Sequence, residues 1–263
     1  MMKFKEIQNF ISQIKKNGKE YYTNCYVFDS AANFHVTKGE ESIVFFIREE
    51  FFNRAYYFTS NLDELVTLLM RVREVVVMDI ICRGTMREKE QKALMQAGFV
   101  NYAIHCKKQY ALQEGGRTEK DSGVFDEFYN PEFFQLAKIE DVQELKDVLY
   151  DVFDPITSHL PTKKQLIEMI QNQNVVYYKI NGRIVALHVF LIQGKVLYSN
   201  ISYNIASADV LYSMERRARE WAYEKYGVKW VYAWYDMTNE KALRRSVYMD
   251  TGQKNYIFVK TEE

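Results

Sequence analysis

Glycine is scarce in this chain: only 11 of its 263 residues are glycine, and no two of them form a G-x-G pattern. Loops that bind dinucleotides or nucleoside triphosphates rely on such glycines, because their backbone must approach phosphate groups closely. The sequence therefore excludes a Rossmann fingerprint and a Walker loop.

Cysteine is also rare, and Cys25, Cys82 and Cys106 are far apart and odd in number. Three thiols cannot all pair within one chain, and no C-x-x-C pair of the kind that binds zinc is present. We expect reduced, mostly buried thiols in a cytoplasmic protein, and no metal site.

Net charge and long hydrophobic runs are absent as well. The 35 basic side chains balance the 35 acidic ones, so no overall field attracts DNA or an anionic membrane. A membrane helix needs about 20 apolar residues, whereas the longest apolar runs, such as residues 75–82, have the length of a strand and contain Asp79. Lysines interrupt residues 1–19, so we expect no signal peptide there.

Aromatic residues, in contrast, are abundant. The 20 tyrosines and 17 phenylalanines indicate a large aromatic core or a lipophilic cleft, within a chain that is 48% hydrophobic. Residues 113–131 interrupt this composition with three glycines, one proline and many charges, which is typical of a linker. We predict an N-terminal domain over residues 1–112, this linker, and a C-terminal domain over residues 132–263.

The C-terminal domain has a regular predicted order of elements. Apolar residues three and four positions apart indicate helices, and short apolar runs joined by turns such as Asn181-Gly182 indicate hairpin strands. The expected strands are residues 133–139, 175–180, 183–192, 195–203, 228–235 and 256–259. The expected helices are residues 140–153, a segment from about residue 162, and residues 207–226 and 239–249.

The N-terminal domain repeats most of that order. The expected helices are residues 4–16, 62–72 and 87–97, and the expected strands are residues 21–28, 41–47, 54–59, 74–81 and 101–110. The two halves share few identical residues, so an internal duplication is inferred from the element order alone.

The C-terminal domain resembles a GCN5-related N-acetyltransferase (GNAT) in this order and in two local segments. Residues 230–239, WVYAWYDMTN, are similar to the family's fifth strand and the asparagine that begins the next helix. Asn239 and Ala242, followed by Tyr248 and Gly252, are similar to the signature N-x-x-A … Y-x-x-x-G. In the first half the segment ALMQAGF, from Ala93, resembles the same helix end and its Gly-Phe turn.

The resemblance implies an α+β fold of two tandem GNAT-like domains, the first degenerate, each with a central, mostly antiparallel sheet flanked by helices. It implies transfer of an acyl group from acetyl-CoA or another acyl-CoA to an amine of a small molecule or peptide. The fourth strand should separate from the fifth, so that the pantetheine amides pair with its exposed backbone. The implied cofactor-binding positions are Ser199, Asn200, Ile201, Ser202, Ser207, Ala208 and Asn239.

Four further residues are candidates for catalysis or substrate binding. A tyrosine matching Tyr248 protonates the departing thiolate in the family, and Asp236, at the end of the fifth strand, is placed to deprotonate an amine. His159 and His188 are candidate substrate contacts. Structural roles remain open for the same residues: Tyr248 as a packed aromatic, Asp236 as a turn residue, His159 as a solvated loop residue and His188 as a satisfied core or surface histidine. Asn239 also fits a helix N-cap.

Two features depart from the family. Residues 204–210 lack the glycines and arginine of the acyl-CoA loop, and Asp209 would stand near the phosphates. Tyr248 lies two positions further from Asn239 than is usual. Two alternatives therefore stay open: a Fem-type aminoacyltransferase that uses aminoacyl-tRNA, and a catalytically inactive binding module.

The long predicted helix carries a cluster of mixed charge. Its members are of mixed sign on one helix, so we expect a solvated face with pairs between residues i and i+4. The cluster consists of Glu215, Arg216, Arg217, Arg219 and Glu220.

Overall fold

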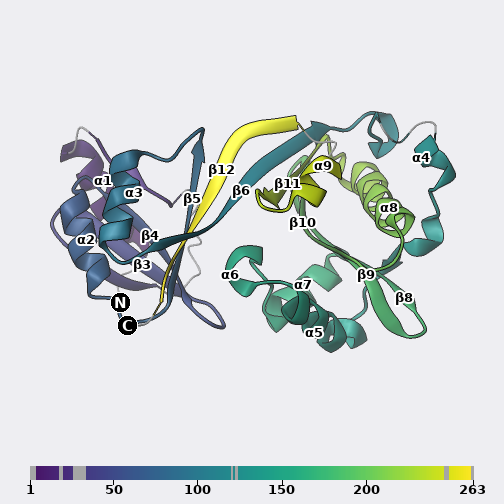
Figure 1. Ribbon diagram of the computed structural model, residues 1–263, viewed down its shortest axis with the longest axis horizontal. Coiled ribbons are helices and arrows are strands. Elements are labelled where there is room, and N and C mark those ends of the chain that lie inside the picture. Colours follow the sequence, from purple (N-terminus) through teal and green to yellow (C-terminus); the bar gives the residue numbers. More distant parts are fainter. Residues whose placement is uncertain are drawn as a thin grey trace. The chain divides into compact units, whose positions relative to one another are not determined.

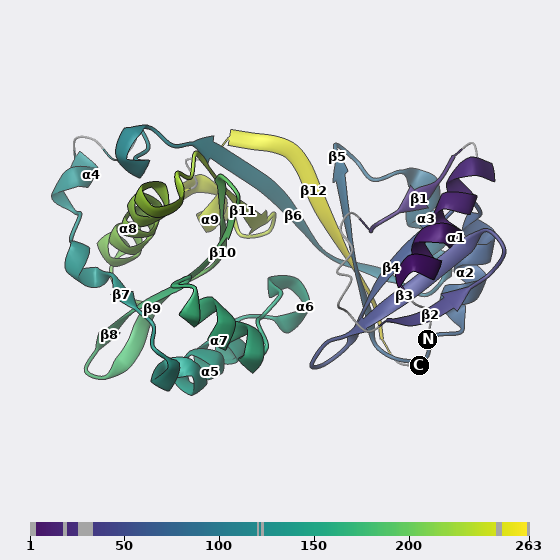
Figure 2. The ribbon, with the colours of Figure 1, turned by 180° about the vertical axis from the view of Figure 1, so that it is seen from behind.

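The computed structural model describes residues 4–17, 20–25, 34–119, 121, 124–245 and 249–261. The chain forms two compact units, which Figure 1 shows from one side and Figure 2 from behind. Unit 1 comprises Met1–His105 and Gly252–Glu263, and unit 2 comprises Cys106–Thr251. In each unit, helices pack on both faces of a sheet that contains parallel and antiparallel strands. The expected mixed α/β fold class is confirmed.

The sheet of unit 1 has one parallel pair within an otherwise antiparallel arrangement. β4 and β5 run parallel, whereas β3 is antiparallel to both of its neighbours, and β12 is antiparallel to β5. The short strand β1 pairs with β4 outside the main order. The order is β2 (His35–Lys38), β3 (Ser42–Arg48), β4 (Asn53–Thr59), β5 (Val76–Arg83) and β12 (Met249–Lys260), with β1 at Tyr22–Thr23.

Three helices bury the two faces of this sheet. α1 (Phe4–Asn17) turns its isoleucines toward one face, and α2 (Leu62–Met70) and α3 (Glu88–Gln96) turn leucines toward the other. Asn61 caps α2, because its side-chain oxygen accepts hydrogen bonds from the first-turn backbone. These helices match the predicted segments closely.

The sheet of unit 2 holds the hairpins that the sequence predicts. Asn181 and Gly182 have φ values of 51° and 77°, as expected for a tight turn between antiparallel strands. β8, β9 and β10 are successively antiparallel, and β10 is parallel to β11. The order is β6 (Val100–Ala111), β11 (Trp230–Asp236), β10 (Val196–Asn204), β9 (Arg183–Gln193), β8 (Val175–Ile180) and β7 (Gln135–Leu136).

Helices cover unit 2 in the same three-layer manner. α8 (Ala208–Tyr226) packs on one face of the sheet, and α5 (Val142–Val152) and α7 (Lys163–Gln171) pack on the other. Thr162 and Gln165 form a capping box that begins α7, and Gly227 ends α8 with φ 63°. The remaining helices are α4 (Val124–Glu127), α6 (Pro155–Ser158) and α9 (Glu240–Arg245).

The last strand of each half extends into the other unit. The chain leaves unit 1 within β6, which neighbours β11 of unit 2, and returns within β12, which pairs with β5 from Gln253 to Lys260. This grouping differs from the predicted domains, which placed all of residues 132–263 together. A composition-based boundary cannot reveal such an exchange, because the final strand has the same apolar pattern whichever sheet it joins.

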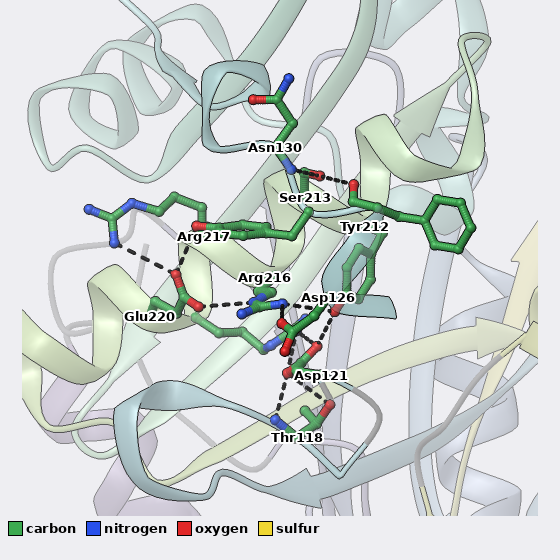
Figure 3. Close-up of polar contacts among 12 residues, drawn as sticks. Thr118, Asp121, Asp126, Asn130, Tyr212, Ser213, Arg216, Arg217 and Glu220 are labelled. Carbon is green, nitrogen blue, oxygen red and sulfur yellow. Dashed lines mark hydrogen bonds and ion pairs between the residues drawn. The ribbon is translucent and has the colours of Figure 1, made fainter. Parts of the chain in front are cut away.

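The predicted linker is a packed part of unit 2. Figure 3 shows how its acidic residues contact α8. Asp121 is only 1% exposed, and both of its carboxylate oxygens accept hydrogen bonds from Arg219, at 2.9 and 3.0 Å. Asp126 pairs with Arg216 at 2.5 Å, and Glu220 accepts from the same guanidinium at 3.0 Å.

These contacts overturn the expectation of a solvated charged face. Arg216 and Arg219 are 2% and 6% exposed, because Asp121 and Asp126, from the described part of residues 113–131, supply carboxylates to α8. Burial alone would raise the pKa of Asp121, but the Arg219 charge and hydrogen bonds from Thr118 hold it below its usual value. Removing one partner of such a buried pair costs about 3–5 kcal/mol.

Two predicted strands are also corrected. Residues 133–139 contribute only Gln135–Leu136 to the sheet, because single turns of 3-10 helix at Pro131–Phe133 and Ile139–Asp141 flank this pair. Asn130 initiates the first of these turns by accepting a hydrogen bond from the Glu132 backbone. The final strand, in contrast, is longer than residues 256–259 and runs over Met249–Lys260.

The close contact between Gly116 and α8 gives a stability prediction. A Cβ at Gly116 would lie 2.8 Å from the Arg219 carbonyl oxygen and from the Glu220 Cα, whereas a Cβ at Gly115 would meet nothing within 4 Å. Both glycines have positive φ, 76° and 71°. Alanine should cost about 1 kcal/mol at either site through backbone strain, and about 1–3 kcal/mol more at Gly116 through overpacking.

Urea unfolding of the two variants measures this difference directly. Gly115→Ala is the matched control, since it shares the backbone conformation but not the contact. Equal losses in the two variants would show that residues 113–131 do not pack on α8 as described.

Candidate functional site

The parallel strands β10 and β11 part after three residue pairs. The pairs are Val196–Trp230, Leu197–Val231 and Tyr198–Tyr232, although both strands continue beyond them. The predicted separation of these strands is therefore confirmed. Beyond Tyr198, no strand of the described residues pairs with the side of β10 that faces β11.

A β-bulge in β10 accompanies the separation. Ser199 pairs with Phe190 and Ile201 with Val189, so Asn200 is the extra residue. A bulge increases local twist and bends the strand that carries it, which directs β10 away from β11. The predicted cofactor positions from Ser199 to Ser202 thus lie on the separating part of the strand.

Unit 1 contains a similar separation, and the chain itself fills it. β4 and β5 form the parallel pairs Asn53–Val76 and Arg54–Val77 and then part. β1 pairs with the end of β4. The buried Asn24 side chain donates to the Ala55 carbonyl at 2.9 Å and accepts from the Tyr57 amide at 2.8 Å.

One side-chain amide therefore satisfies one carbonyl and one N–H group on the parted edge of β4. Thr23 adds a hydroxyl bond to the Tyr57 carbonyl at 2.7 Å. Within the described residues of unit 2, no strand pairs with β10 in the way that β1 pairs with β4. β1 and Asn24 thus occupy the gap in unit 1, whereas no described strand occupies the gap in unit 2.

A polar cluster lies on the α8 face just beyond the bulge. The Ser202 hydroxyl bonds to His188 Nδ1 at 3.0 Å and donates to Glu215 Oε1 at 3.1 Å. Burial lowers the pKa of His188 to about 4, and the Arg219 charge acts in the same direction. Burial also raises the pKa of Glu215. The cluster joins β9, β10 and α8 and keeps the imidazole neutral near pH 7.

His188 is consequently a satisfied core histidine. Its side chain is 1% exposed and stacks on Phe190, with ring centroids 5.4 Å apart. Such burial is what a core histidine would show, whereas a role in substrate binding stays a prediction. His159, the other candidate, is exposed at the end of α6 in a left-handed conformation with φ 47°.

The loop before α8 is organised by its own polar groups. The Asn204 side chain accepts from the Ala206 amide and donates to the Ser207 carbonyl. Ser207 is the N-cap position of α8 and Ala208 its first residue, so both predicted positions stand at a helix N-terminus. Asp209 lies in the first turn, where its charge interacts favourably with the helix dipole and unfavourably with a bound anion.

Asp236 and Asn239 organise the turn after β11. Asp236 accepts from the backbone and the hydroxyl of Thr238, both at 2.8 Å. Asn239 accepts from the Ala242 amide at 3.0 Å, which confirms its interpretation as the N-cap of α9. Tyr248 lies outside the described residues.

Two kinds of site are not found in the described part of the chain. No three His, Cys, Asp or Glu side chains there gather in a way that could hold a metal ion. No helix built from the described residues is both long enough and apolar enough to span a membrane.

Sequence reasoning missed three contributors to this region. Asn24 carries no motif, and its role depends on a strand edge formed more than 30 residues later. The sequence predicts a solvated position for Glu215, but its carboxylate accepts a hydrogen bond from the Ser202 hydroxyl. Tyr232 was included in a central strand, but nothing in the sequence indicates its parallel stack on Tyr198.

Comparison with known proteins supports the fold. No family model matches the sequence, and no curated protein matches it. A GCN5-related N-acetyltransferase from Sphaerobacter thermophilus is 10% identical, with a TM-score of 0.55 over 84% of this chain and 76% of that chain. Another from Kribbella flavida is 11% identical, with a TM-score of 0.52 over 86% and 89% of the two chains. Similarity at this level of identity concerns the fold alone.

The buried histidine gives a pH prediction. His188 has a folded pKa of about 4 and an unfolded value of about 6.5. The unfolded chain therefore takes up the proton first, and this contribution to stability is lost as the pH falls from about 6.5 to about 4. The loss amounts to about 3 kcal/mol over the window.

Urea unfolding at pH 7.5 and pH 5 measures the part of this loss that falls between pH 6.5 and pH 5, about 2 kcal/mol, and His188→Gln should reduce it while keeping a partner for Ser202. Glu215 bonds to the same Ser202 hydroxyl and its raised pKa acts in the opposite direction, so the comparison is made in a Glu215→Gln background. Equal pH dependence in both proteins would contradict the buried, neutral state of His188.

Proposed function

The chain has the fold of the GCN5-related N-acetyltransferases, and on this premise we propose that unit 2 transfers an acyl group from acetyl-CoA or a related acyl-CoA to an amine. The observation that carries the proposal is the parting of β10 from β11 at Tyr198–Tyr232, with the bulge at Asn200. A parted parallel pair offers backbone donors and acceptors to an extended ligand, and the pantetheine arm carries two amides that can pair with them.

The protein contributes to this reaction mainly by positioning the thioester beside the amine. The amine nitrogen attacks the thioester carbonyl carbon; a C–N bond forms, the C–S bond breaks, and sulfur leaves as a thiolate. The amine loses a proton and the thiolate gains one. Backbone N–H groups on the parted edge of β10 stabilise the oxyanion that develops at the carbonyl.

Two residues are proposed for the proton transfers. Asp236, at the carboxyl end of β11, accepts the amine proton directly or through water, and Tyr248 donates a proton to the thiolate. Asp236 is half-buried, and its carboxylate is oriented by Thr238, which fixes the position of one oxygen. His159 is proposed to contact the acceptor from the loop after α6.

Unit 1 is proposed not to bind acyl-CoA. Asn24 forms both hydrogen bonds that an incoming amide would make to β4, and its side chain is only 3% exposed. A ligand would have to displace this buried amide. The missing glycines of the loop before α8 matter less in unit 2, because Ser207 and Ala208 still leave backbone N–H groups at the start of a 19-residue helix.

Calorimetry with acetyl-CoA tests the proposed binding mode. The protein should bind one acetyl-CoA per chain, and deletion of Asn200 should weaken binding at least tenfold. The deletion restores regular pairing between β9 and β10 without moving any flanking side chain to the other face. Deletion of Asn181, in the β8–β9 turn, is the control for shortening unit 2. Unchanged affinity after loss of the bulge, or two acetyl-CoA molecules per chain, would contradict this account.

Tyr248→Phe tests the proposed proton donor. The variant should bind acetyl-CoA with unchanged affinity but transfer the acyl group about 10²-fold or more slowly, the typical contribution of general-acid catalysis. Tyr226→Phe, at the end of α8, is the matched control. Single-turnover measurements with a series of amines separate the two steps; equal rates in both variants would remove Tyr248 from the mechanism.

A further inference from the structure

A pocket of about 270 Å³ lies in unit 2 beside the closed end of the β10–β11 gap. Its walls come from β6, the end of β9, and the first residues of β10 and β11. Leu197 and Val231 face α8, so the alternating residues Trp230 and Tyr232 lie on the opposite face of the sheet. The lining residues are Lys107, Gln109, Gln193, Val196, Trp230, Val231 and Tyr232.

The pocket contains a cation and aromatic rings in a fixed arrangement. The Lys107 ammonium lies 4.1 Å from the centre of the Tyr232 ring. The same ring stacks on Tyr198 at 4.6 Å with an interplanar angle of 4°. The Tyr232 hydroxyl donates to Gln193 Oε1 at 3.2 Å, so three residues contact this ring.

Among the residues that the structure describes, no carboxylate acts on the Lys107 ammonium. Burial is the only cause that shifts its pKa, and it lowers this pKa. The neighbouring Lys108 differs, because its ammonium donates to the Leu243 carbonyl and lies over Tyr235. A half-buried cation without a counter-charge favours binding of an anionic group.

The aromatic wall defines the rest of the ligand. Trp230, the first residue of β11, is 42% exposed and lines the pocket. The amide groups of Gln109 and Gln193 add hydrogen-bonding groups beside it. Together these residues fit a small molecule with a carboxylate next to a flat apolar group.

We propose that this pocket binds the amine acceptor, and that it selects an acceptor carrying a carboxylate and a planar apolar group, with Lys107 binding the carboxylate and Trp230 contacting the plane. The proposal rests on the acyltransferase function of unit 2. Tyr232 belongs both to the last strand pair before the gap and to the pocket lining, so an acceptor bound there lies next to the closed end of the gap.

Equilibrium binding tests the selection without requiring activity. Calorimetry compares N-acetyl-L-phenylalanine, which has the carboxylate, with N-acetyl-L-phenylalaninamide, which lacks it. The wild-type protein should bind the acid at least tenfold more tightly. Lys107→Met should abolish this preference, Lys108→Met should retain it, and Trp230→Ala should weaken both ligands. Equal binding of the two probes, no binding of either, or a preference that survives Lys107→Met would overturn the proposal.

Acetyl transfer distinguishes this proposal from the function on which it rests. With acetyl-CoA as donor, L-phenylalanine should have at least a tenfold higher kcat/KM than L-phenylalaninamide, and Lys107→Met should remove the difference. If the acid probe binds as expected but no amine is acetylated, the proposed function fails and the pocket remains a ligand site. If amines are acetylated without regard to a carboxylate, the acyltransferase function stands and the assignment of the pocket fails.

Discussion

The three-residue contact between β10 and β11 is the constraint on which unit 2 depends. From Val196 to Tyr198, β10 is joined to β11 by backbone hydrogen bonds and by the stacked rings of Tyr198 and Tyr232. After Tyr198, the bulge at Asn200 bends β10 away from β11. The pocket lies at the closed end, the half-buried Ser202 and Glu215 follow the bulge on the α8 face, and the N-terminus of α8 follows the end of β10. The bulge at Asn200 thus lies between the pocket and the start of α8 along the chain.

The comparison between the two units supports this view. In both, a parallel strand pair parts after two or three residues. In unit 1 the edge is satisfied by Asn24, whose amide makes one donor and one acceptor bond to β4. An amide ligand at such an edge would likewise need one N–H donor and one carbonyl acceptor. Under the proposed function, unit 1 satisfies its own gap and unit 2 leaves its gap to a ligand, which would explain the predicted degeneracy of the first half.

The sequence predicted most helices and hairpins because apolar periodicity and turn residues such as Asn181-Gly182 act locally. It also predicted the strand separation and the N-cap role of Asn239, through resemblance to a family. It did not predict the exchange of β6 and β12, the packing of residues 113–131 on α8, or the role of Asn24. Those features depend on pairings between distant segments, and a charged, glycine-containing segment has the same composition whether it is solvated or bound to buried arginines.

Amide hydrogen exchange along β10 tests the central claim most directly. Backbone amides after Tyr198, from Ser199 to Tyr203, should exchange more slowly when acetyl-CoA is bound, because the pantetheine amides occupy the parted edge. The amides of β4 in unit 1 should not respond, since Asn24 already pairs with that edge. Binding of acetyl-CoA without added protection in β10, or with protection in β4 instead, would contradict the account.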